Sequence, residues 1–308
     1  MNTQSNAAPD SPVDSQGTVR AAMSRTGLLY WSIRREFWEN RSLYIAPLAV
    51  AAVILFGFLI STFHHLFSIP DSSHDPGQHT DVLAKPYDFA ALMLMGATLI
   101  VAVFYCLEAF HGERRDRSIL FWKSLPVSDL TTVLSKASIP LLILPLITFV
   151  ITVGTQLVML LLSAAIMAGS GRSIATLTHL PLLQMSLGLF YHLLAMHGLW
   201  YAPFYGWLML VSSWARRAAF LWAALPLLAI GVIEKLAFNT SHFAMMLQTR
   251  FLGGPESASS APGSVLMDPL TLRTLLEFLS SPGLWVGLTI TAAFLAAALR
   301  LRRYGEPI

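Results

Sequence analysis

Long apolar runs separated by short charged segments make up most of this chain. Six runs come close to the about 20 apolar residues that a helix needs to cross a hydrocarbon core of about 30 Å. The predicted spans cover about 46–66, 89–110, 138–167, 185–214, 218–233 and 284–299. The pattern predicts an all-α polytopic membrane protein whose six transmembrane helices form a single domain over 45–304.

The segment 25–44, before the first span, is amphipathic. One broad arc of its helical wheel carries Leu29, Tyr30, Trp31, Ile33, Phe37 and Trp38. The opposite arc carries Ser32, Arg35, Glu36 and Glu39. Arg34 and Arg41 lie within the apolar arc, where long side chains can still reach water. We expect an interfacial helix with aromatic anchors, acting as a lead-in to the first span or as a lever between that span and a cytoplasmic partner.

A charged segment, 112–137, separates the second and third spans. Gly112 permits a break in the chain, and a short helix over 113–125 is predicted to end at Pro126. Ser128 is a good N-cap for a following helix that has Asp129 in its first turn. The predicted elbow exposes an apolar knob made of Ile119, Leu120, Phe121 and Trp122. Such a knob suits a groove on a partner, and the alternative is a helix lying flat in the membrane interface.

Composition supports the membrane assignment and narrows the partners. Of 308 residues, 55% are hydrophobic and 12% are charged, whereas soluble domains carry about a quarter charged residues. No basic patch occurs in a soluble domain, so nucleic acid is not a predicted partner. Cys106 is the only cysteine, which excludes an intrachain disulfide and a cysteine-based metal site. Residues 1–24 are predicted to be a disordered cytoplasmic tail rather than a signal peptide.

The distribution of basic residues sets the expected topology. With six spans, 15 of the 20 Lys and Arg residues fall on the side that holds both termini. The positive-inside rule therefore places both termini, including the tail 305–308, in the cytoplasm, most naturally of a bacterial inner membrane. The acidic loop 71–88 and the segment 236–282 fall outside, and the latter divides into two moderately apolar halves around a Gly/Pro/Ser-rich break.

The elbow also carries a family resemblance. Glu113-Arg114, the Leu-Pro-Val-Ser run at 125–128 and Lys136 follow a second span. This arrangement resembles the permease subunits of ABC-2 type ATP-binding-cassette transporters. The chain departs from the family at Asp116-Arg117-Ser118, where relatives often carry a glycine.

The resemblance implies that the elbow, about 113–130, is the coupling helix that docks on an ATPase subunit. The implied coupling residues are Glu113, Arg114, Arg117, Ile119, Leu120, Phe121, Trp122, Pro126, Ser128 and Asp129. The helix over 25–44 would be the family's connecting helix, with Tyr30, Ile33, Arg34, Phe37 and Trp38 as its contact residues.

The expected activity is transport rather than catalysis. No phosphate-binding loop motif is present, because the glycine-containing stretch 169–173 lacks the required spacing and lysine. ATP and Mg are therefore expected on a separate P-loop ATPase, with no cofactor in this chain. The resemblance implies an exporter whose substrate path lies between two permease subunits, in a homo- or heterodimer.

Ionisable residues near the spans supply the remaining candidates. Glu108 and His111 are predicted to hold the elbow electrostatically, and Glu234 is expected to pair with Lys235 or the outer segment. His192 and His197 lie in the fourth span with Tyr201 and Tyr205, as a candidate substrate path or as helix–helix hydrogen bonders. Five residues apart on an α-helix, the two histidines would point in different directions and form no metal face.

Two alternatives and one further cluster complete the sequence-based account. An ion-coupled carrier usually shows repeats and midplane acidic groups, which are not evident here. An intramembrane enzyme using His192, His197 and Glu234 lacks a known catalytic spacing, so no catalytic or metal residue is predicted. The outer cluster is interpreted as a polar loop in preference to a weak metal site; it comprises His64, His65, His74, His79, Asp71 and Asp75.

Overall fold

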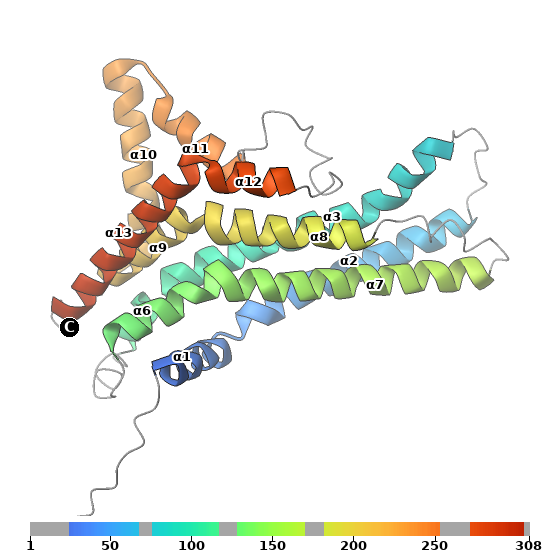
Figure 1. Cartoon of the computed structure of the whole chain (residues 1–308), viewed down its shortest axis with the longest axis horizontal. Coiled ribbons are helices and arrows are strands. Elements are labelled where there is room, and N and C mark those ends of the chain that lie inside the picture. The colour runs from blue at the N-terminus through green and yellow to red at the C-terminus, as the bar shows by residue number, and fades with distance from the viewer. Residues whose placement is uncertain (1–24, 68–75, 117–127, 170–181, 253–271, 305–308) are drawn as a thin grey trace, which may run out of the picture.

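The computed structural model describes residues 25–67, 76–116, 128–169, 182–252 and 272–304, in which almost every residue is helical and none forms a strand (Figure 1). The first half contains α1 (Arg25–Glu39), α2 (Ser42–Phe67), α3 (Pro76–Glu108), α4 (His111–Arg115), α6 (Asp129–Ser138), η1 (Ile139–Ile143) and α7 (Leu144–Gly169). The second half contains α8 (Leu182–His192), η3 (Leu193–Trp200), α9 (Ala202–Trp214), α10 (Ala219–Phe238), α11 (His242–Leu252), α12 (Leu272–Ser280) and α13 (Pro282–Tyr304).

Five helical stretches in the described residues are long and apolar enough to cross a membrane. They are Ser42–Phe63, Ala84–Arg115, Asp129–Gly169, Ala219–Phe238 and Pro282–Tyr304. The chain is therefore an all-helical, multi-pass membrane protein in its described part. These stretches correspond to the predicted first, second, third, fifth and sixth spans. The predicted fourth span is not continuous, because it divides into α8, η3 and α9.

The outer loop predicted over 71–88 is helical from Pro76 onward. Helix α3 already begins at Pro76, about 13 residues before the predicted span. Proline is well suited to the start of a helix, where its missing N–H and fixed φ cost nothing. Ala84, Tyr87 and Ala90 are buried in a cluster with Met159 and Met185, so packing against α7 and α8 extends the helix.

Two π-helical segments meet where the third and fourth hydrophobic runs pass each other. In η1 the N–H of Leu144 donates to the carbonyl of Ile139, five residues back, around Pro140. In η3 the N–H of Tyr201 donates to Met196 in the same way. A Cβ added at Gly198 would lie 2.6 Å from the carbonyl oxygen of Leu141, so only glycine allows this close approach. π-Helical turns are rare and occur most often at functional sites.

A polar stripe on α7 faces inward and joins it to α3. Thr148, Thr152 and Gln156 are buried on this stripe. The hydroxyl groups of Thr98 and Thr148 lie 2.6 Å apart, and the Gln156 amide donates to the carbonyl of Tyr87 at 3.3 Å. Polar side chains of this kind hold membrane helices together, since lipid offers no alternative partner.

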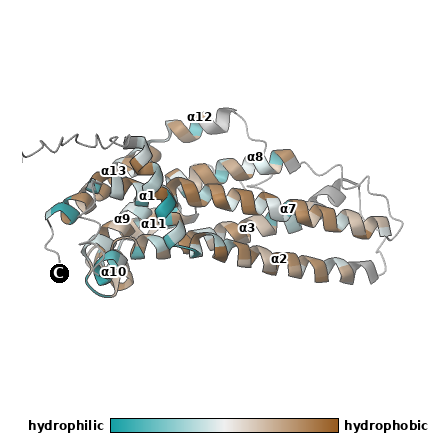
Figure 2. Cartoon of the chain, turned by 90° about the horizontal axis from the view of Figure 1, so that it is seen from below, coloured by the Kyte–Doolittle hydropathy of each residue, from teal (hydrophilic) through white to brown (hydrophobic). Residues whose placement is uncertain are grey.

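Helices α2, α3 and α7 run side by side, whereas α10 projects at a steep angle to them (Figures 1 and 2). The long helices carry hydrophobic residues along most of their length (Figure 2). Large apolar side chains on the outer surfaces of α2 and α10 are exposed, among them Phe56 on α2 and Leu236 on α10. Apolar faces of this kind are typical of helices in contact with lipid or with a second membrane-spanning chain.

Candidate functional site

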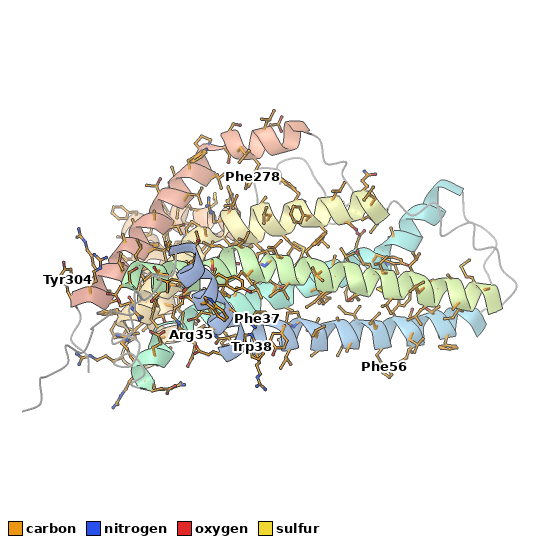
Figure 3. All side chains as sticks on the ribbon, turned by 60° about the horizontal axis from the view of Figure 1, so that its bottom comes forward. Arg35, Phe37, Trp38, Phe56, Phe278 and Tyr304 are labelled. Carbon is orange, nitrogen blue, oxygen red and sulfur yellow. The ribbon has the colours of Figure 1, made fainter. Side chains whose placement is uncertain are left out.

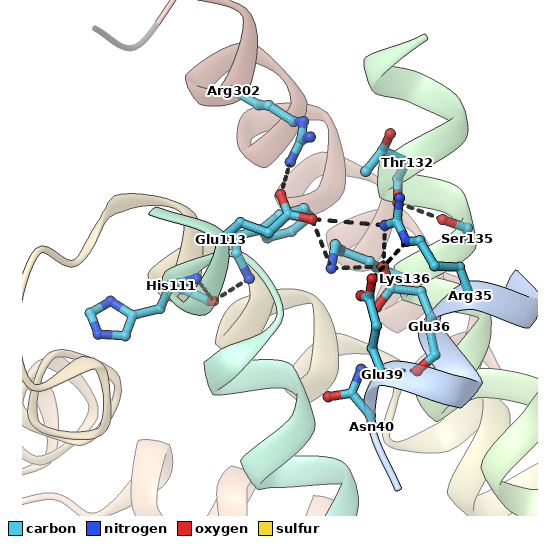
Figure 4. A network of polar contacts seen from close by, with 12 residues as sticks. Arg35, Glu36, Glu39, Asn40, His111, Glu113, Thr132, Ser135, Lys136 and Arg302 are labelled. Carbon is cyan, nitrogen blue, oxygen red and sulfur yellow. Dashed lines mark hydrogen bonds and ion pairs between the residues drawn. The ribbon is translucent and has the colours of Figure 1, made fainter. Parts of the chain in front are cut away.

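Charged residues from four helices meet in the interior at the end of the bundle where α1 lies (Figure 4). We call this set the ion-pair cluster; it consists of Arg35, Glu36, Glu113, Asp129, Lys136 and Arg302. They come from α1, α4, α6 and the C-terminal end of α13. Segments far apart in the sequence are therefore joined through charge in one place.

Lys136 is at the centre of the cluster. Its Nζ lies 2.9 Å from Oε1 of Glu36 and 3.1 Å from Oε1 of Glu113. The side chains of Lys136 and Glu36 are 4% and 1% exposed. The hydroxyl of Tyr105, on α3, donates to the other oxygen of Glu36 at 3.2 Å. One lysine thus bridges two buried carboxylates that would repel each other without it.

Arg302 connects the last helix to the elbow. Its Nη1 donates to Oε2 of Glu113 at 2.7 Å, and its Nε donates to Oδ1 of Asp129 at 3.0 Å. The charged groups of Arg302 and Lys136 each lie 5.8 Å from the centre of the Phe110 ring. An arginine with two carboxylate partners and an aromatic neighbour is a well-satisfied buried cation.

The rim of the cluster is formed by α1. Arg35 lies 2.7 Å from Glu36 and 3.5 Å from Glu39. Burial raises the pKa of the Glu39 carboxyl, against the opposing effect of Arg35. The side chain of Glu39 is half exposed, so this end of the cluster opens toward the surface.

The cluster fixes one arrangement of the four helices. Each buried charge has an opposite charge within hydrogen-bond distance, which offsets the cost of removing it from water. If one helix shifted by a turn, several charges would lose their partners inside the protein. Such a cluster transmits a displacement of one helix to the others, because separating the pairs is costly.

A second set of contacts attaches the elbow to α9. The guanidinium of Arg114 donates to the carbonyls of Ser212 at 2.5 Å and Ala215 at 3.0 Å. The Ser212 hydroxyl accepts from the backbone N–H groups of Phe110 and His111. Nδ1 of His111 lies 3.1 Å from the carbonyl of Ala215. Cationic donors at the last carbonyls of α9 are stabilising because that end of a helix carries a partial negative charge.

The structure places the predicted elbow residues in different surroundings. Ser128 is the N-cap, since its Oγ accepts from the N–H of Thr131 at 3.1 Å, and Asp129 lies in the first turn of α6. Glu113 and Arg114 face into the protein rather than outward. Glu108, predicted to hold the elbow electrostatically, pairs with Arg115 of α4 at the surface. The remaining predicted coupling residues lie outside the described residues: Arg117, Ile119, Leu120, Phe121, Trp122 and Pro126.

The helical wheel of α1 separated its two arcs but did not predict the burial of Glu36. Glu36, expected on the polar outer arc, is buried in the ion-pair cluster. Ile33 and Phe37 pack against the neighbouring core, whereas Tyr30 and Trp38 are exposed. The exposed rings fit the predicted aromatic anchors, and the ion pairs with Arg35 and Lys136 hold Glu36 inside the protein.

The fourth-span candidates pack inside the chain. His192, His197 and Tyr205 are buried, and the Tyr201 hydroxyl donates to the carbonyl of Phe251 at 2.9 Å. The π-helical conformation of η3 changes the geometry expected for the histidines. Residues five apart point in more similar directions in a π-helix than in an α-helix, so His197 in η3 lies nearer to the direction of His192 than predicted. No group of three or more potential metal ligands occurs in the described residues, and side chains of the outer histidine cluster lie outside them.

Arg250 holds the short helix α11 against the bundle, which the sequence did not indicate. Its guanidinium carbon lies 3.9 Å from the centre of the Trp200 ring. It also donates to the carbonyls of Trp200 at 3.1 Å and Gly283 at 2.9 Å. In return, the indole N–H of Trp200 donates to the carbonyl of Arg250 at 2.9 Å. The start of α13, the end of η3 and α11 are thereby joined at one point.

Of the two partners expected for Glu234, Lys235 and the outer segment 236–282, it is the outer segment that Glu234 contacts. Its carboxylate accepts from the N–H groups of His242 at 2.7 Å and Phe243 at 2.8 Å, and from the Thr240 hydroxyl at 2.8 Å. It therefore caps the start of α11, as carboxylates commonly do at helix N-termini. The two predicted halves of the outer segment contain α11 and α12, respectively.

Comparison with protein-family models, with curated proteins and with solved structures gave no match.

Proposed function

We propose that this chain is the permease subunit of an ATP-driven exporter of the ABC-2 type. In this proposal two such subunits, identical or different, form the substrate path, and separate P-loop ATPases bind ATP and Mg. The end of the bundle that carries the ion-pair cluster faces the cytoplasm of a bacterial inner membrane. Both termini lie on that side, in keeping with the distribution of Lys and Arg.

The observation that carries the proposal is the position of Glu113. It lies at the start of the elbow and contacts both Lys136 of α6 and Arg302 of α13. Lys136 in turn contacts Glu36 of α1. A partner that pushes on the elbow would therefore move α1, α6 and α13 together. A permease needs such a connection, because the energy of hydrolysis is released outside the membrane.

The contacts of Arg114 add support. They connect the same elbow to α9, which is the main packing partner of α13. Force on the elbow would thus reach both helices of this pair. The π-helical segments η1 and η3 and the proline residues provide points where the helices can bend.

Co-purification tests the proposal. The tagged protein is extracted from native membranes with a mild detergent, and co-purifying chains are identified by mass spectrometry. We expect a stoichiometric P-loop ATPase that is lost in the double variant Phe121→Ala/Trp122→Ala. Tyr304→Ala, which removes an exposed aromatic ring on α13, serves as the matched control and should retain the ATPase. Absence of any ATPase from the wild-type preparation would favour an ion-coupled carrier instead.

A further inference from the structure

The outward face of α1 is aromatic and basic. Tyr30, Trp31 and Trp38 are 59%, 51% and 67% exposed. The guanidinium of Arg34 lies 5.0 Å from the centre of the Trp31 ring, and Arg34 itself is exposed. On a helical wheel these four residues occupy one arc, opposite Glu36.

The acidic residues of α1 do not share this face. Glu36 is buried in the ion-pair cluster, and Glu39 lies beside Arg35. Arg41, just beyond the end of α1, is exposed and adds a second positive charge close to Trp38 in the sequence. The outward face is therefore positively charged, and its arginines lie close to tyrosine and tryptophan rings.

The orientation of α1 places this face at membrane-surface depth. Figure 3 shows α1 running across the direction of α2, at one end of the long helices. A helix placed across the end of a membrane span lies near the lipid headgroups. Trp and Tyr concentrate at that depth, and arginine binds phosphate oxygens through parallel N–H donors. Charge and ring chemistry thus favour a phospholipid with a net negative charge over a zwitterionic one.

We infer that the outward face of α1 is a binding site for anionic phospholipid headgroups, with Arg34 as the main phosphate contact. Trp31 holds the Arg34 guanidinium in place, while Trp38 and Tyr30 anchor the helix beside the acyl chains. The inference rests on the membrane location of the chain and not on the proposed exporter function. Because Glu36 lies on the opposite face of α1, a lipid that binds here also influences where α1 holds Glu36 within the ion-pair cluster.

Native mass spectrometry of the purified full-length protein tests this inference. The protein in detergent micelles is titrated separately with phosphatidylglycerol and with phosphatidylcholine, and retained lipids are counted. We expect wild-type protein to retain phosphatidylglycerol in preference to phosphatidylcholine. Arg34→Gln should weaken phosphatidylglycerol binding about fivefold, and the Arg34→Gln/Arg41→Gln double variant should weaken it further. Binding of phosphatidylcholine should not change.

The matched control is Arg217→Gln, which removes an exposed arginine from the turn between α9 and α10. It should leave phosphatidylglycerol binding at the wild-type level. Arg34→Lys, which keeps the charge but not the planar donor pair, should fall between wild type and Arg34→Gln. An unchanged preference in the double variant would overturn the inference, as would an equal loss in Arg217→Gln. Finding an acidic protein, and no lipid, bound to this face of α1 would also overturn the inference.

Discussion

Lys136 holds together two carboxylates that lie almost entirely out of contact with water. Replacing it by methionine keeps the length of the side chain and removes the charge between Glu36 and Glu113. Each carboxylate then keeps only an arginine partner, Arg35 for Glu36 and Arg302 for Glu113. Removing one partner of a buried ion pair typically costs about 3–5 kcal/mol. We therefore predict that Lys136→Met lowers the free energy of unfolding by that amount, measured by denaturant titration in mixed micelles.

The matched control for this prediction is Arg115→Met. Arg115 also contacts a carboxylate, that of Glu108 at 3.1 Å, but both side chains are more than half exposed. Exposed pairs contribute little, so the control should unfold much like the wild type. Equal stability of Lys136→Met and wild type would contradict the structural role given to the cluster.

Gly198 is a second residue whose replacement has a predictable cost. An alanine Cβ would lie 2.6 Å from the carbonyl of Leu141, a backbone atom that cannot rotate away. Overpacking of this kind typically costs about 1–3 kcal/mol. We predict that Gly198→Ala destabilises the protein by this amount in the same titration. Gly154→Ala, where no atom lies within 4 Å of the added Cβ, should leave stability unchanged or raise it slightly.

At the scale of elements, the Arg250 side chain joins α11 to both η3 and the start of α13. Arg250 contacts Trp200 and Gly283, and the apolar side chains of α11 are largely exposed. We predict that Arg250→Ala increases hydrogen exchange in α11 while leaving α7 protected. Arg250→Lys should not restore protection, because a lysine cannot stack on the ring and reach both carbonyls.

Gln248→Ala is the appropriate comparison for α11, since Gln248 is an exposed neighbour on the same helix. Its exchange rates should match those of the wild type. Slow exchange of α11 in Arg250→Ala would show that other contacts hold the helix.

How far the sequence predicted these elements depended on the type of signal. Apolar length predicted α2, α7, α10 and α13, because a membrane imposes it. Capping chemistry predicted the start of α6 at Ser128. The interruption of the fourth run at Tyr201 was missed, since the hydrophobic pattern continues across it. The ion-pair cluster was missed because its members lie far apart in the chain; Arg302 and Glu36 meet only through α6 and the elbow.

At the scale of the whole molecule, the number of membrane crossings decides the topology. The run over α8, η3 and α9 is broken, and α10 is steeply inclined to the long helices (Figure 1). We predict that both nevertheless cross, giving six crossings. In a Cys106→Ala background, single cysteines at Arg115 and Arg217 should react with an impermeant thiol reagent only from the cytoplasm. Ser241→Cys should react in intact cells.

The cysteine background is suitable because Cys106 is fully buried. Outside labelling at Arg217→Cys would show that the broken run does not cross. Labelling of Arg217→Cys and Ser241→Cys from the same side would show that α10 does not cross the membrane.

The central claim is that the ion-pair cluster connects a docked ATPase to the membrane helices. The most direct measurement is the ATP hydrolysis rate of the co-purified complex in lipid vesicles, with and without the permease. Glu113→Gln removes the carboxylate shared by Lys136 and Arg302, and Glu108→Gln removes an exposed carboxylate nearby as the control. We predict that both variants bind the ATPase and that only Glu113→Gln loses the permease-dependent change in rate. Wild-type hydrolysis in a stable Glu113→Gln complex would contradict the claim.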